Sequence, residues 1–225
     1  MNMDQARSNM IEQQIRPWEV LDPTVLNIMR AIPREYFVSA EYQRLAYADI
    51  EIPLAHGEFM LHPRVEGRLL QELAINPHDK CLEIGTGSGY LTACMAHLSD
   101  HVDSIDIHSD FIELAQQRLT DSAINNITLE QKNALTDLES KQQYDSILIS
   151  AAVREENVNH FKNMLNIGGR LMLVIGTTQQ PIMQATLIIR QSTDQFSRMG
   201  IFETKLKPLH GQSTEHAKTN ITFQL

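Results

Sequence analysis

Residues 81–90 read Cys81-Leu82-Glu83-Ile84-Gly85-Thr86-Gly87-Ser88-Gly89-Tyr90, an apolar strand pattern that runs into a turn with glycine at alternate positions. A helix pattern follows over 90–98, and a second apolar stretch ends in Ser104-Ile105-Asp106-Ile107. A strand, a glycine turn, a helix and a strand that ends in a carboxylate are typical of parallel α/β proteins that hold a nucleoside-containing cofactor. This stretch therefore predicts an α/β fold with a cofactor site at the turn.

Strand and helix patterns alternate after this turn. Apolar patterns predict strands over 80–84, 101–107, 127–130, 144–150 and 170–175, and helices over 90–98, 111–119 and 155–165. We interpret Gly168-Gly169 as the end of the last of these helices. Strand patterns at 182–189 and 196–206 have no helix between them, and residues 211–225 are a polar tail or a final edge strand. The sequence predicts a Rossmann-like, doubly wound, mostly parallel sheet with antiparallel edge strands.

The N-terminal third contains helix patterns but no strand–glycine–helix unit. Residues 4–16 predict a helix that ends before Pro17, because a residue that precedes proline is pushed away from helical angles. Asp22 and Pro23 begin a second helix, as its cap and its first-turn proline. Pro33 begins a third segment, and apolar residues recur at helical spacing over 63–74. We expect these helices to cover the sheet.

The composition argues against several classes of protein. The chain has 225 residues, of which 42% are hydrophobic, and a net charge of −9, which is unfavourable for a nucleic-acid surface. Its longest apolar run, over 171–175, has strand length, and residues 1–7 lack the apolar core of a signal peptide. Cys81 and Cys94 suggest no disulfide framework and fit core positions. We expect a cytoplasmic protein that binds neither membrane nor nucleic acid; its oligomeric state is open.

The spacing of the glycines indicates the cofactor. Dinucleotide sites use Gly-x-Gly-x-x-Gly, whereas here the third glycine comes one residue earlier and is followed by Tyr90. A carboxylate followed by Gly-x-Gly-x-Gly is typical of sites for S-adenosyl-L-methionine. Asp106 is placed to accept both ribose hydroxyls, Glu83 to orient the turn or meet the ammonium group, and Asn133-Ala134 to meet the adenine edge. The full set of predicted cofactor residues is Met60, Leu61, Glu83, Gly85, Thr86, Gly87, Ser88, Gly89, Asp106, Ile107, Asn133 and Ala134.

Several further blocks carry a resemblance. They include Met10-Ile11-Glu12-Gln13-Gln14-Ile15-Arg16, Ala31-Ile32-Pro33-Arg34, Leu45-Ala46-Tyr47-Ala48-Asp49, Tyr144-Asp145, Ser150-Ala151-Ala152 and Gly168-Gly169-Arg170-Leu171. With the glycine turn, these blocks resemble the protein-L-isoaspartate O-methyltransferase family over residues 9–208. The resemblance implies a single methyltransferase domain over 1–225: a helical cover with an acceptor-side loop (1–75), a cofactor-binding core (76–180), and edge strands with a tail (181–225). It implies S-adenosyl-L-methionine as methyl donor, S-adenosyl-L-homocysteine as product, and esterification of isoaspartyl carboxylates in protein repair.

The chain departs from the family pattern on the acceptor side. The family has Gly-x-x-x-Ser-x-Pro before its first long helix, whereas this chain has Leu61 at the serine position of residues 57–63. Asn133 replaces the family's aspartate in the adenine loop. Our hypothesis is a divergent member that keeps methyl transfer, to a protein or peptide carboxylate or to a shifted acceptor such as a small molecule. Alternatives are a catalytically silent S-adenosyl-L-methionine-binding protein and a nicotinamide oxidoreductase, which Tyr90 argues against.

The remaining candidates lie around this altered motif. His56 and His62 flank it and are candidate general bases, although a loop histidine bonded to solvent or backbone is the simpler interpretation. Tyr47, His56, Leu61 and His210 are candidate substrate-binding residues. No group of histidine, cysteine and carboxylate residues has metal-ligand spacing along the sequence, so we expect no metal.

Overall fold

A seven-stranded sheet organises the computed structural model, which describes residues 2–138 and 142–212. Its strands are β3 (Lys80–Ile84), β4 (His101–Asp106), β5 (Ile127–Gln131), β6 (Tyr144–Val153), β7 (Leu165–Ile175), β8 (Met183–Arg190) and β9 (Phe196–Thr204). They lie in the order β5-β4-β3-β6-β7-β8-β9; β3 to β7 pair in parallel, and β8 and β9 pair antiparallel. The predicted α/β class, parallel core and antiparallel edge strands are confirmed.

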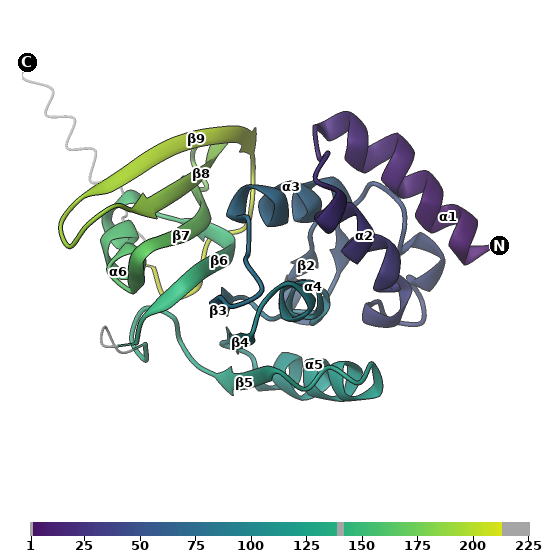
Figure 1. Cartoon of the computed structure of the whole chain (residues 1–225). Helices are drawn as coiled ribbons and strands as arrows, with labels where there is room; N and C mark the ends of the chain where they lie inside the picture. The colour runs from purple at the N-terminus through teal and green to yellow at the C-terminus, as the bar shows by residue number, and fades with distance from the viewer. Residues whose placement is uncertain (1, 139–141, 213–225) are drawn as a thin grey trace, which may run out of the picture.

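Helices cover the two faces of the sheet unequally. On one side lie α1 (Met3–Met10), α2 (Pro23–Ala31), α3 (Pro63–Leu73), α4 (Tyr90–Leu98) and α5 (Ser109–Asp121), and on the other lies α6 (Val158–Lys162), as Figure 1 shows. The larger apolar core includes Met29 of α2, Leu69 of α3 and Met95 of α4 together with the sheet residue Leu148. The smaller core, which includes Phe161 of α6, fills the opposite face. The sheet is therefore doubly wound, with the thicker layer formed by the N-terminal half.

In the N-terminal cover, the second helix begins at the cap that the sequence predicts. The Asp22 carboxylate accepts a hydrogen bond from the Thr24 amide at 2.7 Å and begins α2. The first helix does not end at Pro17; it continues from α1 through a π-turn, η1 (Ile11–Ile15), into a 3₁₀ turn, η2 (Arg16–Trp18). Proline is tolerated there because it lies in the first turn of η2, where a backbone N–H would have no partner within the helix. Shorter elements complete this region: η3 (Arg34–Phe37), η4 (Gln43–Leu45), η5 (Ala55–Gly57), and the two-stranded sheet of β1 (Ile52–Pro53) and β2 (Phe59–Met60).

Two predictions about the last crossover were wrong. The helical part of 155–165 is shorter than expected, a 3₁₀ turn η6 (Glu155–Asn157) followed by α6, and Leu165 already belongs to β7. Gly168-Gly169 does not end that helix but lies inside β7, which advances from residue 165 to 170 while β6 advances from 144 to 146. A β-carbon on Gly169 would come within 3.0 Å of the Tyr144 carbonyl oxygen. The glycines therefore allow a bulge in the sheet rather than a helix cap.

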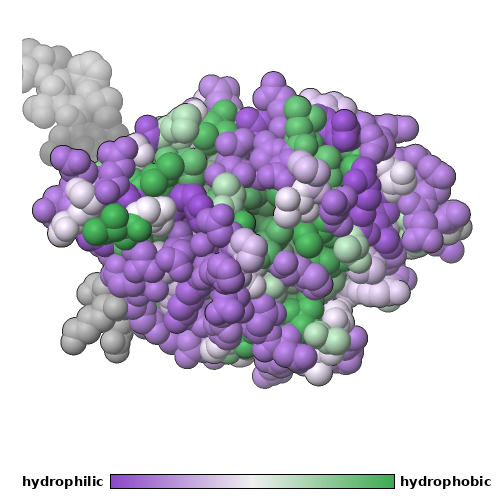
Figure 2. Space-filling model, in the orientation of Figure 1, coloured by the Kyte–Doolittle hydropathy of each residue, from purple (hydrophilic) through white to green (hydrophobic). Residues whose placement is uncertain are grey.

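The surface is mostly polar. In Figure 2 charged and polar residues cover most of the face, and apolar side chains reach the surface near the middle of the view. Within residues 2–138 and 142–212, no helix combines the length and apolar character needed to cross a membrane. The polar tail proposed for 211–225 lies, beyond residue 212, outside the described residues.

Candidate functional site

The turn after β3 brings the backbone close to its neighbours. Gly85 has φ of +100°, and the Gly85 amide donates to the Ile105 carbonyl of β4 at 2.9 Å. A β-carbon on Gly85 would overlap the hydroxyl oxygen of Ser150, which enters from the end of β6. Only glycine combines this left-handed conformation with this closeness. The turn thus leaves bare backbone at the carboxyl ends of three neighbouring parallel strands, where α/β proteins bind ligands.

Asp106 ends β4 beside this turn. Its carboxylate accepts from the Gly87 amide at 3.0 Å and from the His108 amide at 3.0 Å. These two bonds fix the carboxylate against the turn while its oxygens keep further acceptor sites, since an ionised carboxylate accepts about four hydrogen bonds. Asp106 also lines the pocket described below. The geometry fits the predicted acceptor for a pair of ribose hydroxyls.

Glu83 lies behind the turn rather than in the pocket. Its side chain is fully buried, and its Oε2 accepts from Thr92 and, at 2.6 Å, from Ser104. The Ser104 hydroxyl lies 2.7 Å from the hydroxyl of Thr86 in the turn. Burial raises the pKa of Glu83 to about 8, so its carboxyl is largely protonated at neutral pH. Of the two predicted roles, this geometry fits the orientation of the turn and not contact with an ammonium group.

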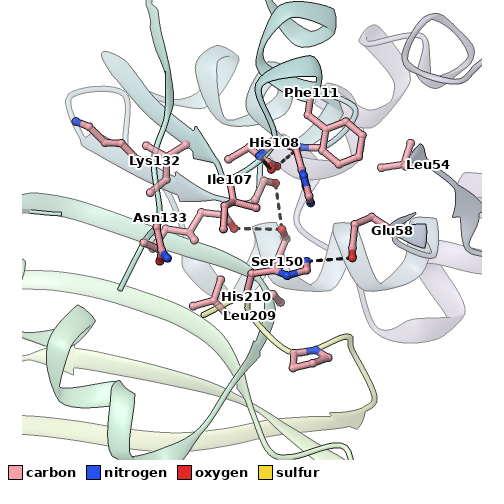
Figure 3. A pocket seen from close by; sticks show the side chains of 18 of the residues that line it. Leu54, Glu58, Ile107, His108, Phe111, Lys132, Asn133, Ser150, Leu209 and His210 are labelled. Atoms are coloured by element: carbon pink, nitrogen blue, oxygen red, sulfur yellow. Dashed lines mark hydrogen bonds and ion pairs between the residues drawn. The ribbon is translucent and has the colours of Figure 1, made fainter. Parts of the chain in front are cut away.

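A pocket of about 680 Å³, measured out to its open mouth, lies over the turn. Figure 3 shows Lys132 and Asn133 on one side and Phe111 with Leu54 on the other. Its walls combine apolar side chains with a few polar groups, as in sites for adenosine-containing ligands. The cradle therefore fits the predicted cofactor: bare backbone at Gly85, a carboxylate at Asp106 and apolar walls.

A second pocket, of about 1060 Å³, adjoins the first. Glu58, Pro208, Leu209 and His210 line both. The His210 imidazole lies 3.2 Å from the Glu58 carboxylate, a contact drawn in Figure 3. The second pocket adds two cationic side chains, Arg154 and Lys207. The two pockets therefore share lining residues and lie side by side.

The structure brings only part of the predicted set together around the first pocket. The predicted residues that line it are Gly85, Gly87, Asp106, Ile107, Asn133, Ala134 and His210. Five predicted cofactor residues are buried and do not line it, namely Met60, Glu83, Thr86, Ser88 and Gly89.

The remaining candidates lie elsewhere. Leu61 and His62 line a third pocket, beside Trp18, and the Leu61 carbonyl accepts from Arg34 at 2.6 Å. Tyr47 is buried, and its hydroxyl donates to Glu35. His56 lies next to the first pocket, where it contacts His108 and Asp110, and these three residues are considered below.

Several pocket residues escaped the sequence analysis. They are Leu54, Ile84, Ile105, His108, Phe111, Lys132, Ser150, Ala151, Pro208 and Leu209, whereas Glu58 and Phe59 belong to the 56–63 segment that the sequence places over the methyl group. His108 and Phe111 follow the Asp106 strand directly, so their position after a strand end was a usable signal. Leu54 and residues 208–209 come from distant loops, and no local pattern marks them.

Comparisons with known proteins identify the family of the chain. The model of the family "Protein-L-isoaspartate(D-aspartate) O-methyltransferase (PCMT)" matches residues 5–207. A protein-L-isoaspartate O-methyltransferase of Koribacter versatilis is 33% identical over 91% of this chain and 90% of its own length. One of Protochlamydia amoebophila is 32% identical over 90% of this chain and 96% of its own length.

Solved structures share the fold. A Plasmodium falciparum protein-L-isoaspartate O-methyltransferase structure, in complex with S-adenosyl-L-homocysteine, superposes with a TM-score of 0.77 at 19% identity, covering 93% of this chain and 98% of that one. The matched residues run from α1 through β9 and so include most of the N-terminal cover and the whole seven-stranded sheet. This chain belongs to the protein-L-isoaspartate(D-aspartate) O-methyltransferase family.

Proposed function

We propose that the chain transfers the methyl group of S-adenosyl-L-methionine to a carboxylate oxygen of an isoaspartyl residue in a protein or peptide. The carboxylate oxygen attacks the methyl carbon, the carbon–sulfur bond breaks, and its electron pair stays on sulfur. The products are a methyl ester and S-adenosyl-L-homocysteine. The acceptor is already ionised at neutral pH, so no general base is required. His56 and His62 therefore need no role as proton acceptors.

The observation that carries this proposal is the wall shared by the two pockets. Asp106 and Asn133 line the first pocket, where they would hold the ribose and the adenine. Glu58 and His210 line both pockets, so a methyl group beside them in the first pocket would lie next to an acceptor bound in the second. The protein's contribution is to position the two reactants and to exclude water.

The second pocket has the charge that a carboxylate acceptor requires. Lys207 donates to the Gly57 carbonyl and lies 3.5 Å from the Glu58 carboxylate. The Lys207 side chain is 44% exposed, and Arg154 lines the same pocket. Lys207 pairs with Glu58, and Arg154 pairs with Glu156 at 2.6 Å, so an acceptor carboxylate would exchange with these partners to reach the two cations. This arrangement supplies a means of holding the acceptor that does not depend on a hydroxyl at position 61.

The test is methyl transfer from radiolabelled S-adenosyl-L-methionine to a synthetic isoaspartyl peptide, with the aspartyl peptide of the same sequence as the comparison. We expect label only in the isoaspartyl peptide, in an ester that base hydrolyses. Lys207→Met should raise KM for the peptide about fivefold or more, since charged hydrogen-bond partners contribute about 1.5–3 kcal/mol. Lys205→Met is the matched control because Lys205 lines the third pocket instead.

Each other outcome has a defined meaning. Label in lysate proteins or small molecules but not in the isoaspartyl peptide would indicate a shifted acceptor. Binding of S-adenosyl-L-homocysteine without labelling of any substrate would indicate the catalytically silent alternative. If Leu61→Ser raises activity on the peptide, a hydroxyl at that position can still reach the acceptor despite the placement of Leu61 in the third pocket.

A further inference from the structure

Three side chains that can ligate a metal meet beside the first pocket, one from η5 and two from the start of α5. They are His56 of η5, His108 after β4 and Asp110 in the first turn of α5. One ligand atom from each lies within 4.8 Å of the other two. His56 Nε2 is 2.9 Å from both carboxylate oxygens of Asp110. His56 is separated from Asp110 by 54 residues of sequence, so no local spacing could reveal the group.

The backbone presents His56 to this group at a conformational cost. His56 has φ of +56°, the left-handed region that side-chain-bearing residues seldom adopt. Its ring stacks on the His108 ring, with centroids 4.0 Å apart and planes at 3°. Phe111 meets both rings edge-on, with centroids at 5.5 and 5.4 Å. The two imidazoles are therefore held together by packing as well as by the Asp110 carboxylate.

The His108 ring, which also lines the first pocket, has a nitrogen without a partner. Its Nε2 atom is buried and has no hydrogen-bond partner among the described residues. An imidazole nitrogen that is shielded from water without a partner is unfavourable, because a buried polar group loses its hydration and regains nothing. A bound cation would satisfy such a nitrogen.

We propose that His56, His108 and Asp110 form a binding site for a divalent transition metal ion, with Zn²⁺ as the best match. Two imidazoles and one carboxylate are a donor set that zinc uses in proteins, with a water molecule in the fourth position. Zinc bonds of about 2.0 Å place tetrahedral ligand atoms about 3.3 Å apart, so the stacked rings must tilt toward each other. The His56 and Asp110 side chains are 42% and 53% exposed, which leaves them room to do so.

The proposed metal site lies at the rim of the first pocket, between two segments that line it. Leu54 and Glu58, on either side of His56, line the first pocket, and so do His108 and Phe111. A metal ion bound here would tie the 54–58 segment to the start of α5 across the rim of that pocket. This site is not needed for methyl transfer as proposed above, and its test does not depend on that activity.

The experiment measures metal binding by the whole chain, produced without a histidine tag. Calorimetric titration with ZnCl₂ should show one ion per chain, and Co²⁺ should give visible absorption bands of a site with nitrogen and oxygen ligands. His56→Ala and Asp110→Asn should each weaken Zn²⁺ binding at least tenfold, since even indirect partners of a metal change its affinity by about 10–100-fold. MgCl₂ should not bind, because imidazole is a poor ligand for magnesium.

His101→Ala provides the matched control. His101 lies 3.2 Å from Asp103, so it is another histidine–carboxylate pair on the surface but lacks a second imidazole. It should leave Zn²⁺ affinity unchanged. Far-UV circular dichroism and the melting temperature without metal verify that each variant is folded, and Zn²⁺ should raise the melting temperature of the wild type and of His101→Ala only. Equal Zn²⁺ affinity in wild type, His56→Ala and Asp110→Asn would overturn the proposal.

Discussion

At the scale of single residues, Gly85 shows how local backbone chemistry controls the site. Its φ of +100° is strained for any other residue, and its missing β-carbon leaves room for the Ser150 hydroxyl, which donates to the Gly85 carbonyl at 3.1 Å. Gly168 has a similar φ of +85°, but a β-carbon there would meet nothing within 4 Å. A comparison of substitutions at Gly85 and Gly168 therefore distinguishes the cost of a strained backbone from the cost of steric overlap.

We predict that Gly168→Ala lowers the free energy of unfolding by about 1–2 kcal/mol, which is the cost of a strained backbone alone. Gly85→Ala should cost more and should also weaken S-adenosyl-L-homocysteine binding at least tenfold, because the overlap with Ser150 displaces the turn. Urea denaturation and calorimetric titration measure the two effects. Adding Ser150→Gly to Gly85→Ala should restore part of both; equal losses in the two alanine variants would contradict the steric argument.

Glu83 predicts a pH dependence of stability. Its folded-state pKa of about 8 lies above its ordinary value of 4.5, because its carboxyl is buried. Between these two values the unfolded chain has released a proton that the folded chain still holds. Glu83 therefore contributes most to the free energy of unfolding below about pH 4.5. This contribution decreases as pH rises toward 8, by up to about 1.4 kcal/mol per pH unit.

Glu83→Gln should remove this slope, because the amide mimics the protonated carboxyl and cannot ionise. Urea denaturation of both proteins at several pH values between about 5 and 8 gives the comparison. Burial also raises the pKa of Glu66, so only the difference between variant and wild type reports on Glu83. Parallel pH profiles for the two proteins would show that Glu83 is ionised in the folded state.

At the scale of secondary-structure elements, one buried ion pair joins three segments of the cover. The Arg34 guanidinium, in η3, donates to Glu66 of α3 at 3.0 Å and to the carbonyls of Ala46 and Leu61 at 2.7 and 2.6 Å. Arg34 and Glu66 are 0% and 1% exposed. The Arg34 guanidinium therefore supplies hydrogen bonds to a carboxylate and to two carbonyl groups that water cannot reach.

Arg34→Met should lower the free energy of unfolding by about 3–5 kcal/mol, since it leaves the Glu66 carboxylate buried without a counter-charge. The double variant Arg34→Met/Glu66→Leu should lose less than Arg34→Met alone. Urea denaturation of the double-mutant cycle measures the coupling. If the double variant instead loses the sum of the two single losses, the pair does not act as a unit.

At the scale of the whole molecule, the N-terminal cover and the sheet share one core. Residues from α1, α2 and α3 pack in the same apolar cluster as sheet residues such as Met172 and Leu187. Trp18, the single tryptophan, lies in the cover and meets the Phe202 ring of β9 edge-on at 5.6 Å. Its fluorescence therefore reports contact between the cover and the edge of the sheet.

We predict that the described chain unfolds as one cooperative unit, as a shared core requires. In urea, Trp18 fluorescence and the far-UV circular dichroism signal should follow the same transition with the same midpoint. Trp18→Phe, followed by circular dichroism alone, checks that the reporter itself is not needed for cooperativity. A fluorescence change at lower urea than the circular dichroism change would instead separate residues 3–31 from the sheet as a unit of their own.

Much of the fold was predictable because it depends on local patterns. The Lys80–Ile84 strand and the Tyr90–Leu98 helix have the bounds that hydrophobic periodicity predicts. Gly168-Gly169 was misjudged because the same residue type serves a helix end and a bulge, and the neighbouring strand decides between them. Most of the predicted residues that line the first pocket, such as Asp106 and Asn133, lie at or just after the end of a strand, whereas His210 lies in a loop beyond the last strand.

The sequence by itself determined the alternation of strands and helices, the bare turn at residues 85–89 and the acid at 106, because backbone conformation and side-chain periodicity are properties of neighbouring residues. Only the tertiary structure decided that Leu61 and His62 line a different pocket, that Ser150 and residues 208–209 line the first one, and that His56 meets His108. The physical reason is that these contacts join loops far apart in sequence. Their positions follow from how the cover packs on the sheet, which no single stretch of residues encodes.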